Sequence, residues 1–148
     1  MSLLYELYQE IIIDHSASPR NEGHLVPMTH FAEAYNATCG DELTLSLQVV
    51  DDRIKDVKFH AQGCSISKAS GSMMTEKIKN MTIGEASEFS QKLQTILSSD
   101  HLNLLSEEAM GDLVALLGVK QFPMRIKCAT LAWHALDHAL INSLRSIS

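Results

Sequence analysis

Three cysteines and one aspartate stand where they could bind a single metal ion. Cys39 and Asp41 flank Gly40, and residues two apart in an extended chain point to the same side. Gly40 carries no side chain and lets the backbone bend, so this thiolate and this carboxylate can converge on one ion. Cys64 precedes a segment with helical character, and Cys128 lies in the first turns of the last expected helix. Three sulfur donors and one oxygen donor suit tetrahedral zinc.

The neighbours of the cysteines favour their thiolate forms. A thiol at a helix N-terminus, such as that of Cys64, is stabilised as thiolate by the helix dipole, and we expect Ser65 or Ser67 to cap that helix. Arg125 and Lys127 flank the third cysteine and can offset part of the formal charge of about −2 that three thiolates, a carboxylate and Zn²⁺ would leave. The donors are not spaced as a local zinc motif. From the residues alone, metal binding and simple burial of the thiols therefore remain equally open.

The composition is that of an ordinary globular chain and argues against several classes of protein. A length of 148 residues suits one domain, spanning 1–148, with one hydrophobic core. The net charge is −6 and the Lys and Arg residues are scattered, so we expect no nucleic-acid partner. Glu6 and Glu10 interrupt the apolar N-terminus, which argues against a signal peptide, and no apolar run approaches the roughly 18 residues that span a bilayer. Because an odd number of cysteines also argues against a disulfide framework, we expect a cytoplasmic protein without a membrane partner.

Three alternating segments predict the sheet that must position Cys39 and Asp41. Apolar and polar residues alternate over 31–37, 42–50 and 53–61, with an irregularity near Asp56, and Asp51-Asp52 marks a tight turn between the last two segments. Short links between consecutive strands predict an antiparallel meander with one buried face.

The remainder of the chain predicts helices. Apolar residues recur at helical spacing in five segments: 3–14, 65–80, 83–97, 112–117 and 124–144. We expect Gly118 to end the short helix, Pro123 to open the last one, and 98–111 to form a polar loop with some helical character. The expected fold is α+β, a three-stranded antiparallel sheet with helices packed on one face.

Two pairs of polar residues receive structural interpretations. His134 and His138 are four residues apart on the last expected helix, a spacing that can bind zinc. No third ligand accompanies them, so we interpret them as a solvent-facing or partner-facing helix edge. Asp14-His15 lies at the end of the first expected helix, where a histidine suits the dipole, and we favour capping or partner docking over acid–base catalysis.

The sequence resembles the SufU/IscU group of iron–sulfur cluster assembly proteins over almost its whole length. The matching stretches are Asn36-Ala-Thr-Cys-Gly-Asp41, Gly63-Cys-Ser-Ile-Ser67, Ala69-Ser-Gly-Ser-Met-Met74 and Arg125-Ile-Lys-Cys-Ala-Thr-Leu-Ala-Trp133, with a similar N-terminal Asp14-His15-x3-Pro19-Arg-Asn21. The IscU branch has a histidine where this chain has Lys127, and the segment 83–97 looks like a helix added between the last two cysteines. Both features indicate the SufU branch. Ala37 replaces a proline that is frequent in the family, a change that bears on the stiffness of the loop rather than on ligation.

The resemblance implies the same α+β fold and a zinc ion held by Cys39, Asp41, Cys64 and Cys128. It also implies a sulfurtransferase-like role, in which the protein takes persulfide sulfur from a pyridoxal-phosphate-dependent cysteine desulfurase and passes it toward downstream iron–sulfur assembly proteins. The desulfurase would supply a replacement ligand and thereby free one cysteine.

We predict Cys39 as the sulfur acceptor, because a turn beside a glycine can move more easily than a helix start, and Cys128 is the alternative. Arg125 would support the negative site or contact the partner. Two other functions remain open. The same ligands could hold iron or a transient cluster in a scaffold, which a protonated Lys127 disfavours, or zinc could only stabilise a non-catalytic binding module.

Overall fold

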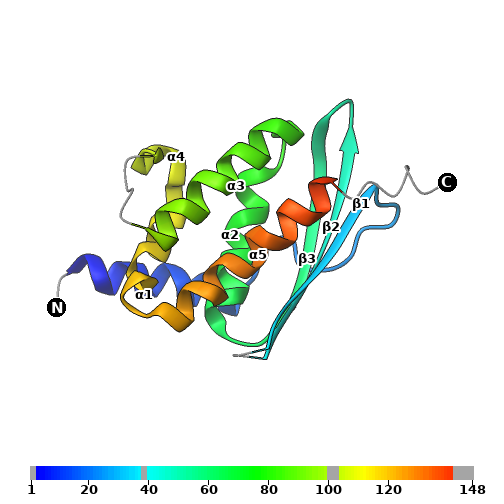
Figure 1. Cartoon of the computed structure of the whole chain (residues 1–148). Coiled ribbons are helices and arrows are strands. Elements are labelled where there is room, and N and C mark those ends of the chain that lie inside the picture. The colour runs from blue at the N-terminus through cyan, green and yellow to red at the C-terminus, as the bar shows by residue number, and fades with distance from the viewer. Residues whose placement is uncertain (1–2, 38–39, 100–103, 142–148) are drawn as a thin grey trace.

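A three-stranded antiparallel sheet lies against a set of helices in the computed structural model, which describes residues 3–37, 40–99 and 104–141. The strands are β1 (His30–Asn36), β2 (Asp41–Val50) and β3 (Arg53–Gln62), in the order β1-β2-β3. Figure 1 shows the helices gathered on one side of this sheet. The expected α+β fold is thereby confirmed.

The sheet buries one face because its apolar residues keep a period of two. Leu43, Leu45 and Leu47 of β2 are at most 1% exposed, and Leu45 lies opposite Phe59 on β3. The predicted irregularity is a bulge: Gln48 pairs with Asp56 while Val49 pairs with Ile54, which leaves one extra residue on β3. The bulge returns the β3 side chains to the inner face.

The hairpin turn at Asp51-Asp52 is also confirmed. Both residues have positive φ, +52° and +66°, the backbone that tight two-residue hairpins require.

Helices precede and follow the strands in the described part of the chain. They are α1 (Leu3–Ala17), α2 (Ser65–Ile78), α3 (Ile83–Ser98), α4 (Glu107–Met110), the 3-10 helix η2 (Gly111–Gln121) and α5 (Pro123–Ile141). α2 and α5 pack directly on the sheet, and α1, α3 and η2 pack on those two helices from outside. The start of α2 and the start of α5 are thus brought to the sheet end where β2 begins.

Close contact between α2 and the sheet depends on a glycine. A Cβ atom at Gly71 would lie 2.6 Å from the ring of Phe59, so a larger residue would push the helix away from β3. Met73 and Met74, on the same helix, belong to the core. Only a residue without a side chain permits this helix position.

The predictions for 98–121 are partly wrong. The structure places the short α-helix at Glu107–Met110, capped by Ser106, and Gly111 with φ of +55° ends it. The segment expected as a helix over 112–117 is 3-10 helix, and it runs through Gly118 instead of ending there. The glycine with the left-handed backbone was the real helix stop, and the sequence does not distinguish the two. α5 begins at Pro123 as predicted, and its predicted extension to Leu144 lies outside the described residues.

His15 has a different role from the one expected. It is 1% exposed, its Nδ1 lies 2.8 Å from Ser72 Oγ, and its Nε2 lies 3.0 Å from Asp112 Oδ2. The histidine therefore joins α1 to α2 and η2, and its burial rules out direct docking. His134 and His138 are exposed on α5, as the interpretation of a helix edge requires.

Candidate metal centre

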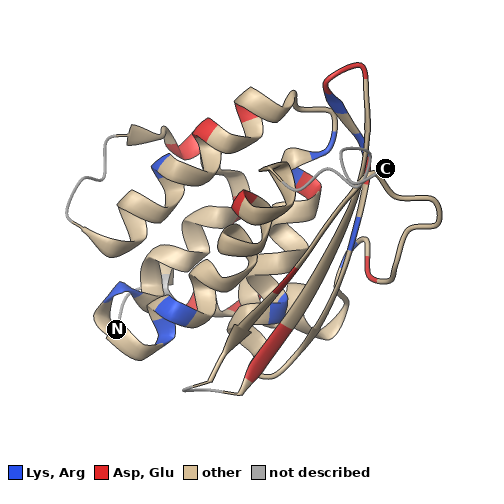
Figure 2. Ribbon diagram, turned by 45° about the vertical axis from the view of Figure 1, so that its right-hand side comes forward, with Lys and Arg blue, Asp and Glu red and all other residues tan. Residues whose placement is uncertain are grey.

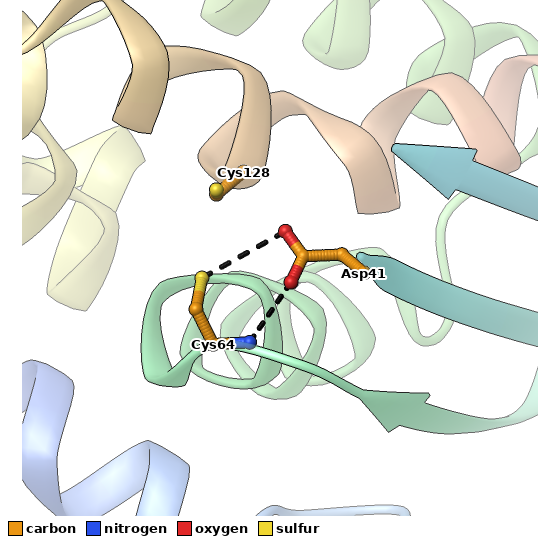
Figure 3. A group of neighbouring side chains, drawn as sticks. All are labelled: Asp41, Cys64 and Cys128. Carbon is orange, nitrogen blue, oxygen red and sulfur yellow. Dashed lines mark hydrogen bonds between the residues drawn. The ribbon is translucent and has the colours of Figure 1, made fainter. Parts of the chain in front are cut away.

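Three predicted ligands come together where β2, α2 and α5 meet. Asp41 is the first residue of β2, Cys64 is the N-cap of α2, and Cys128 lies in the second turn of α5. One carboxylate oxygen and the two sulfur atoms all lie within 4.8 Å of one another. Figure 3 shows the three side chains pointing toward a common centre. Cys39, the fourth predicted ligand, lies outside the described residues.

Asp41 is fully buried and held at both oxygens. Its Oδ1 accepts a hydrogen bond of 2.8 Å from the Cys64 N–H, and its Oδ2 accepts one of 2.8 Å from the Ser67 hydroxyl. Burial by itself would raise the pKa of the Asp41 carboxyl. Hydrogen bonds from the Cys64 N–H, the nearby thiols and Ser67 outweigh burial and hold that pKa below its ordinary value. The carboxylate is thus charged and oriented at neutral pH.

Gly63 makes room for the carboxylate. Its φ is +131°, and a Cβ atom there would lie 2.1 Å from Asp41 Oδ1. Both the backbone and the space therefore require glycine at this position. Gly40, with φ of +70°, has the left-handed backbone that favours glycine, but no atom of the described residues lies within 4 Å of where its Cβ would be.

The predicted cap of α2 is wrong. Cys64 occupies the N-cap position and makes no side-chain capping hydrogen bond among the described residues, so neither Ser65 nor Ser67 fills that role. Sulfur is a weak hydrogen-bond acceptor, which agrees with the absence of a capping bond to the Cys64 side chain. The backbone N–H of Cys64 donates to Asp41, which lies on another element. Ser67, the third residue of the helix, turns toward the carboxylate.

Cys128 is more enclosed than Cys64. It is 2% exposed, its Sγ lies 3.9 Å from Asn36 Nδ2, and it donates toward the carbonyl of Met124 at 3.8 Å. Cys64 is half-buried. Asn36 ends β1 directly opposite Asp41, so one pair of the ladder supplies a contact to Cys128 and a candidate ligand. Sequence reasoning gave Asn36 no role, although it opens one of the recognised motifs.

Arg125 lines a groove whose described lining includes none of the candidate ligands. It is exposed in the first turn of α5 and lines a groove of about 490 Å³ together with Tyr8, Ser65, Ile66 and Phe122. Since Ser65 and Ile66 directly follow Cys64, the groove adjoins the more accessible thiol. Figure 2 shows the Lys and Arg residues distributed over several elements, interspersed with Asp and Glu.

The described donors fit a zinc ion. Around tetrahedral zinc, with Zn–S of about 2.3 Å and Zn–O of about 2.0–2.2 Å, neighbouring donor atoms lie about 3.5–3.8 Å apart. Asp41 Oδ2 and Cys64 Sγ are already 3.8 Å apart. Two thiols and a charged carboxylate are also donors that zinc prefers, so small side-chain movements suffice for coordination.

Comparison with known proteins identifies a family. The sequence model of the NifU-like N terminal domain matches residues 7–142. The chain is 41% identical over 131 residues to the "Zinc-dependent sulfurtransferase SufU" of Bacillus subtilis, which covers 88% of this chain and 87% of that protein. It is 37% identical over 145 residues to the "Iron-sulfur cluster assembly scaffold protein IscU" of Streptococcus pyogenes, covering 97% of this chain and 88% of that one.

Solved structures agree. A crystal structure described as a putative iron–sulfur cluster assembly scaffold protein for the SUF system, from Fervidobacterium islandicum, superposes with a TM-score of 0.82 at 34% identity. The superposition covers 92% of this chain and 98% of the Fervidobacterium chain. A NifU-like protein from Brucella abortus gives a TM-score of 0.81 at 19% identity, which supports the fold alone. None of the helices within 3–37, 40–99 and 104–141 is long and apolar enough to cross a membrane.

Proposed function

The chain belongs to the NifU-like N-terminal domain family, which includes the SufU and IscU iron–sulfur assembly proteins, and from this premise we propose that it is a zinc-bound sulfur acceptor in cluster assembly. The observation that carries the proposal is the convergence of Asp41, Cys64 and Cys128 within 4.8 Å. Cys39 precedes Asp41 by two residues, in the connection between the paired residues Asn36 and Asp41, and completes the proposed ligand set.

Zinc in this site would keep its thiolates deprotonated without taking part in redox chemistry. The protein's own residues orient the ligands and stabilise negative charge. Asp41 remains fixed by its two hydrogen bonds, and the exposed side chains of Arg125 and Lys127 lower the energy of an anionic site and of an approaching anionic persulfide.

In the proposed transfer, the Cys39 thiolate attacks the outer sulfur of the partner's persulfide. The S–S bond of the partner breaks, a new S–S bond forms on Cys39, and the partner's cysteine leaves as thiolate, so no net oxidation occurs. Burial supports this choice of acceptor, because Cys128, the alternative, is 2% exposed. Cys64 is more accessible than Cys128, so it belongs in the test as well.

The partners follow from the same chemistry. We propose a pyridoxal-phosphate-dependent cysteine desulfurase as donor and downstream iron–sulfur assembly proteins as recipients. We propose that the donor docks at the groove that is lined by Ser65, Ile66 and Arg125, next in sequence to Cys64. We propose the cytoplasm as the compartment, because thiols stay reduced there, and we propose that residues 1–148 act as one domain.

A scaffold for cluster assembly is the second candidate, favoured by the names of the Streptococcus pyogenes and Thermotoga maritima relatives. The same thiolates could hold iron and sulfide. Lys127 argues against it, because its ammonium group cannot replace a histidine ligand. A module that zinc merely stabilises is less well supported, since the core extends through the sheet and helices far from the site.

The test combines metal analysis with sulfur transfer. The purified protein should be colourless, contain one zinc ion and accelerate cysteine desulfuration by a desulfurase. Each of Cys39, Cys64 and Cys128 is replaced by serine, and persulfide uptake is measured separately from zinc content. His134→Ala, an exposed change on α5, serves as control. A brown protein that does not accelerate the desulfurase supports the scaffold, and persulfide uptake by Cys39→Ser contradicts the assigned acceptor.

A further inference from the structure

One buried hydroxyl contacts the side chains of Asp41 and Cys64 and the backbone of Cys128. Ser67 is 0% exposed, and its Oγ lies 2.8 Å from Asp41 Oδ2, 3.6 Å from Cys64 Sγ and 3.3 Å from the carbonyl oxygen of Cys128. A serine in this position is not needed as a helix cap, because Cys64 is the N-cap. Its contacts point to the ligands.

The single proton of Ser67 goes to the carboxylate. Asp41 Oδ2 is the nearest acceptor and the charged one, and charge-assisted hydrogen bonds are the stronger ones. The other oxygen, Oδ1, is already engaged by the Cys64 N–H. With both oxygens held, the carboxylate has one orientation, in which Oδ2 lies 3.8 Å from Cys64 Sγ and keeps a second lone pair for a metal ion.

We propose that Ser67 is a positioning residue of the metal centre, whose hydroxyl fixes Asp41 as a ligand through one oxygen. This inference rests on the metal binding in the proposed function. A hydroxyl that holds a metal-binding carboxylate changes metal affinity without binding the ion, and loss of such a group typically weakens affinity about 10- to 100-fold. Ser67→Ala should therefore bind zinc about 10- to 100-fold more weakly.

The same helix offers a matched control. Ser70 is also 0% exposed, donates to the carbonyl of Ala129 at 2.6 Å and accepts from Trp133 Nε1 at 3.1 Å. Both serines lie on the side of α2 that faces α5, close to the carbonyls of successive residues, Cys128 for Ser67 and Ala129 for Ser70. Only Ser67 also touches Asp41 and Cys64. A merely structural role predicts similar effects of the two substitutions, whereas positioning predicts different ones.

The experiment measures zinc affinity of the full chain by competition with a chromophoric chelator, with the Co²⁺ absorption spectrum as a report on ligand geometry. Ser67→Ala should lose affinity and change the spectrum, Ser67→Thr, which keeps the hydroxyl, should restore both, and Ser70→Ala should leave both unchanged. In an Asp41→Ala background, Ser67→Ala should cause no further loss, because it acts through that carboxylate. Should Ser67→Ala unfold, a stabilising osmolyte keeps the folded state measurable.

Equal affinity of Ser67→Ala and the unsubstituted chain overturns the proposal. Equal losses in Ser67→Ala and Ser70→Ala also overturn it, since packing of α2 on α5 then explains both. An unsubstituted chain that binds no metal defeats this inference together with the proposed function. Tight zinc binding that is indifferent to Ser67 defeats the inference alone.

Discussion

At the scale of single residues, the candidate metal centre depends on residues that are not ligands. Gly63 leaves space for the Asp41 carboxylate, and Ser67 donates a hydrogen bond to it. The side chains that converge here could be proposed from the sequence as candidate ligands, because thiols and a carboxylate beside glycines carry recognisable chemistry. The contacts of Ser67 and Asn36 could not, since each reaches a residue that is distant along the chain. Local sequence patterns predict that a serine near a helix start caps the helix, but here a carboxylate that is distant along the chain accepts its hydrogen bond.

A substitution at Gly63 tests whether the Asp41 carboxylate needs the space that a glycine leaves. Gly63→Ala should destabilise the protein by about 2–4 kcal/mol and abolish tight zinc binding, because the new Cβ would lie 2.1 Å from Asp41 Oδ1 on a left-handed backbone. Urea unfolding and zinc titration measure both effects. Gly84→Ala is the matched control, since the nearest described atom to its Cβ would be Thr82 Oγ1 at 4.0 Å. Similar unfolding midpoints for the two variants would contradict the steric argument.

The charge of Asp41 predicts a pH dependence in the metal-free protein. Folding lowers the pKa of this carboxyl below its unfolded value. Its ionised form therefore contributes stability that is fully present above the unfolded pKa and is lost as pH falls through the folded pKa. Between neutral pH and about pH 3, Asp41→Asn should lose less stability than the unsubstituted chain, as measured by urea midpoints. Parallel pH profiles of the two proteins would show that the carboxyl contributes nothing.

At the scale of elements, the strands were more predictable than the helices that follow them. Alternation over 42–50 and 53–61 fixed the inner face and even indicated the bulge, because a one-residue slip reverses the side chains. The helix predicted over 112–117 has the wrong type and the wrong end, because apolar spacing there suits an α-helix or a 3-10 helix equally. Gly111, which ends α4, is distinguished from Gly118 by its positive φ, which only the folded packing determines.

The His15 link predicts how the outer layer is held. His15→Ala removes hydrogen bonds to Ser72 and Asp112 and should destabilise the protein by about 1–3 kcal/mol. Zinc content should stay unchanged, because the link lies outside the ligand set. Since α1 and η2 both line the groove, acceleration of the desulfurase should fall. Thermal unfolding, metal analysis and the coupled assay measure these three outcomes.

A matched substitution separates this effect from the loss of any histidine. His134 is exposed on α5, and His134→Ala should change stability by less than about 0.5 kcal/mol. Normal acceleration of the desulfurase by a folded His15→Ala protein would show that the groove tolerates movement of α1.

At the scale of the whole molecule, the core does not depend on the metal. Buried apolar residues run from the sheet through α2 and α5 to α3 and η2, well beyond the ligands. Such a core suffices for folding of a chain of this size. Zinc should therefore add stability by mass action, about 4 kcal/mol when free zinc is 1,000 times its dissociation constant, and not create the fold.

Removal of the metal tests this directly. After treatment with a strong chelator, the far-ultraviolet circular dichroism should be preserved, and one cooperative thermal transition should remain at a lower midpoint. Readdition of zinc should restore the original midpoint. A chelated chain that loses its helices would instead favour the zinc-stabilised module, and two separate transitions would contradict a single domain.

The three described donors come from β2, α2 and α5, so the centre is assembled from the early, middle and late parts of the chain. A nascent or truncated polypeptide that lacks α5 has only part of the set, whatever else it has folded. A zinc ion bound as proposed would consequently discriminate between finished and unfinished molecules, and metal capture would serve as a checkpoint on biogenesis. Only polypeptides that have completed their topology would then be presented with sulfur.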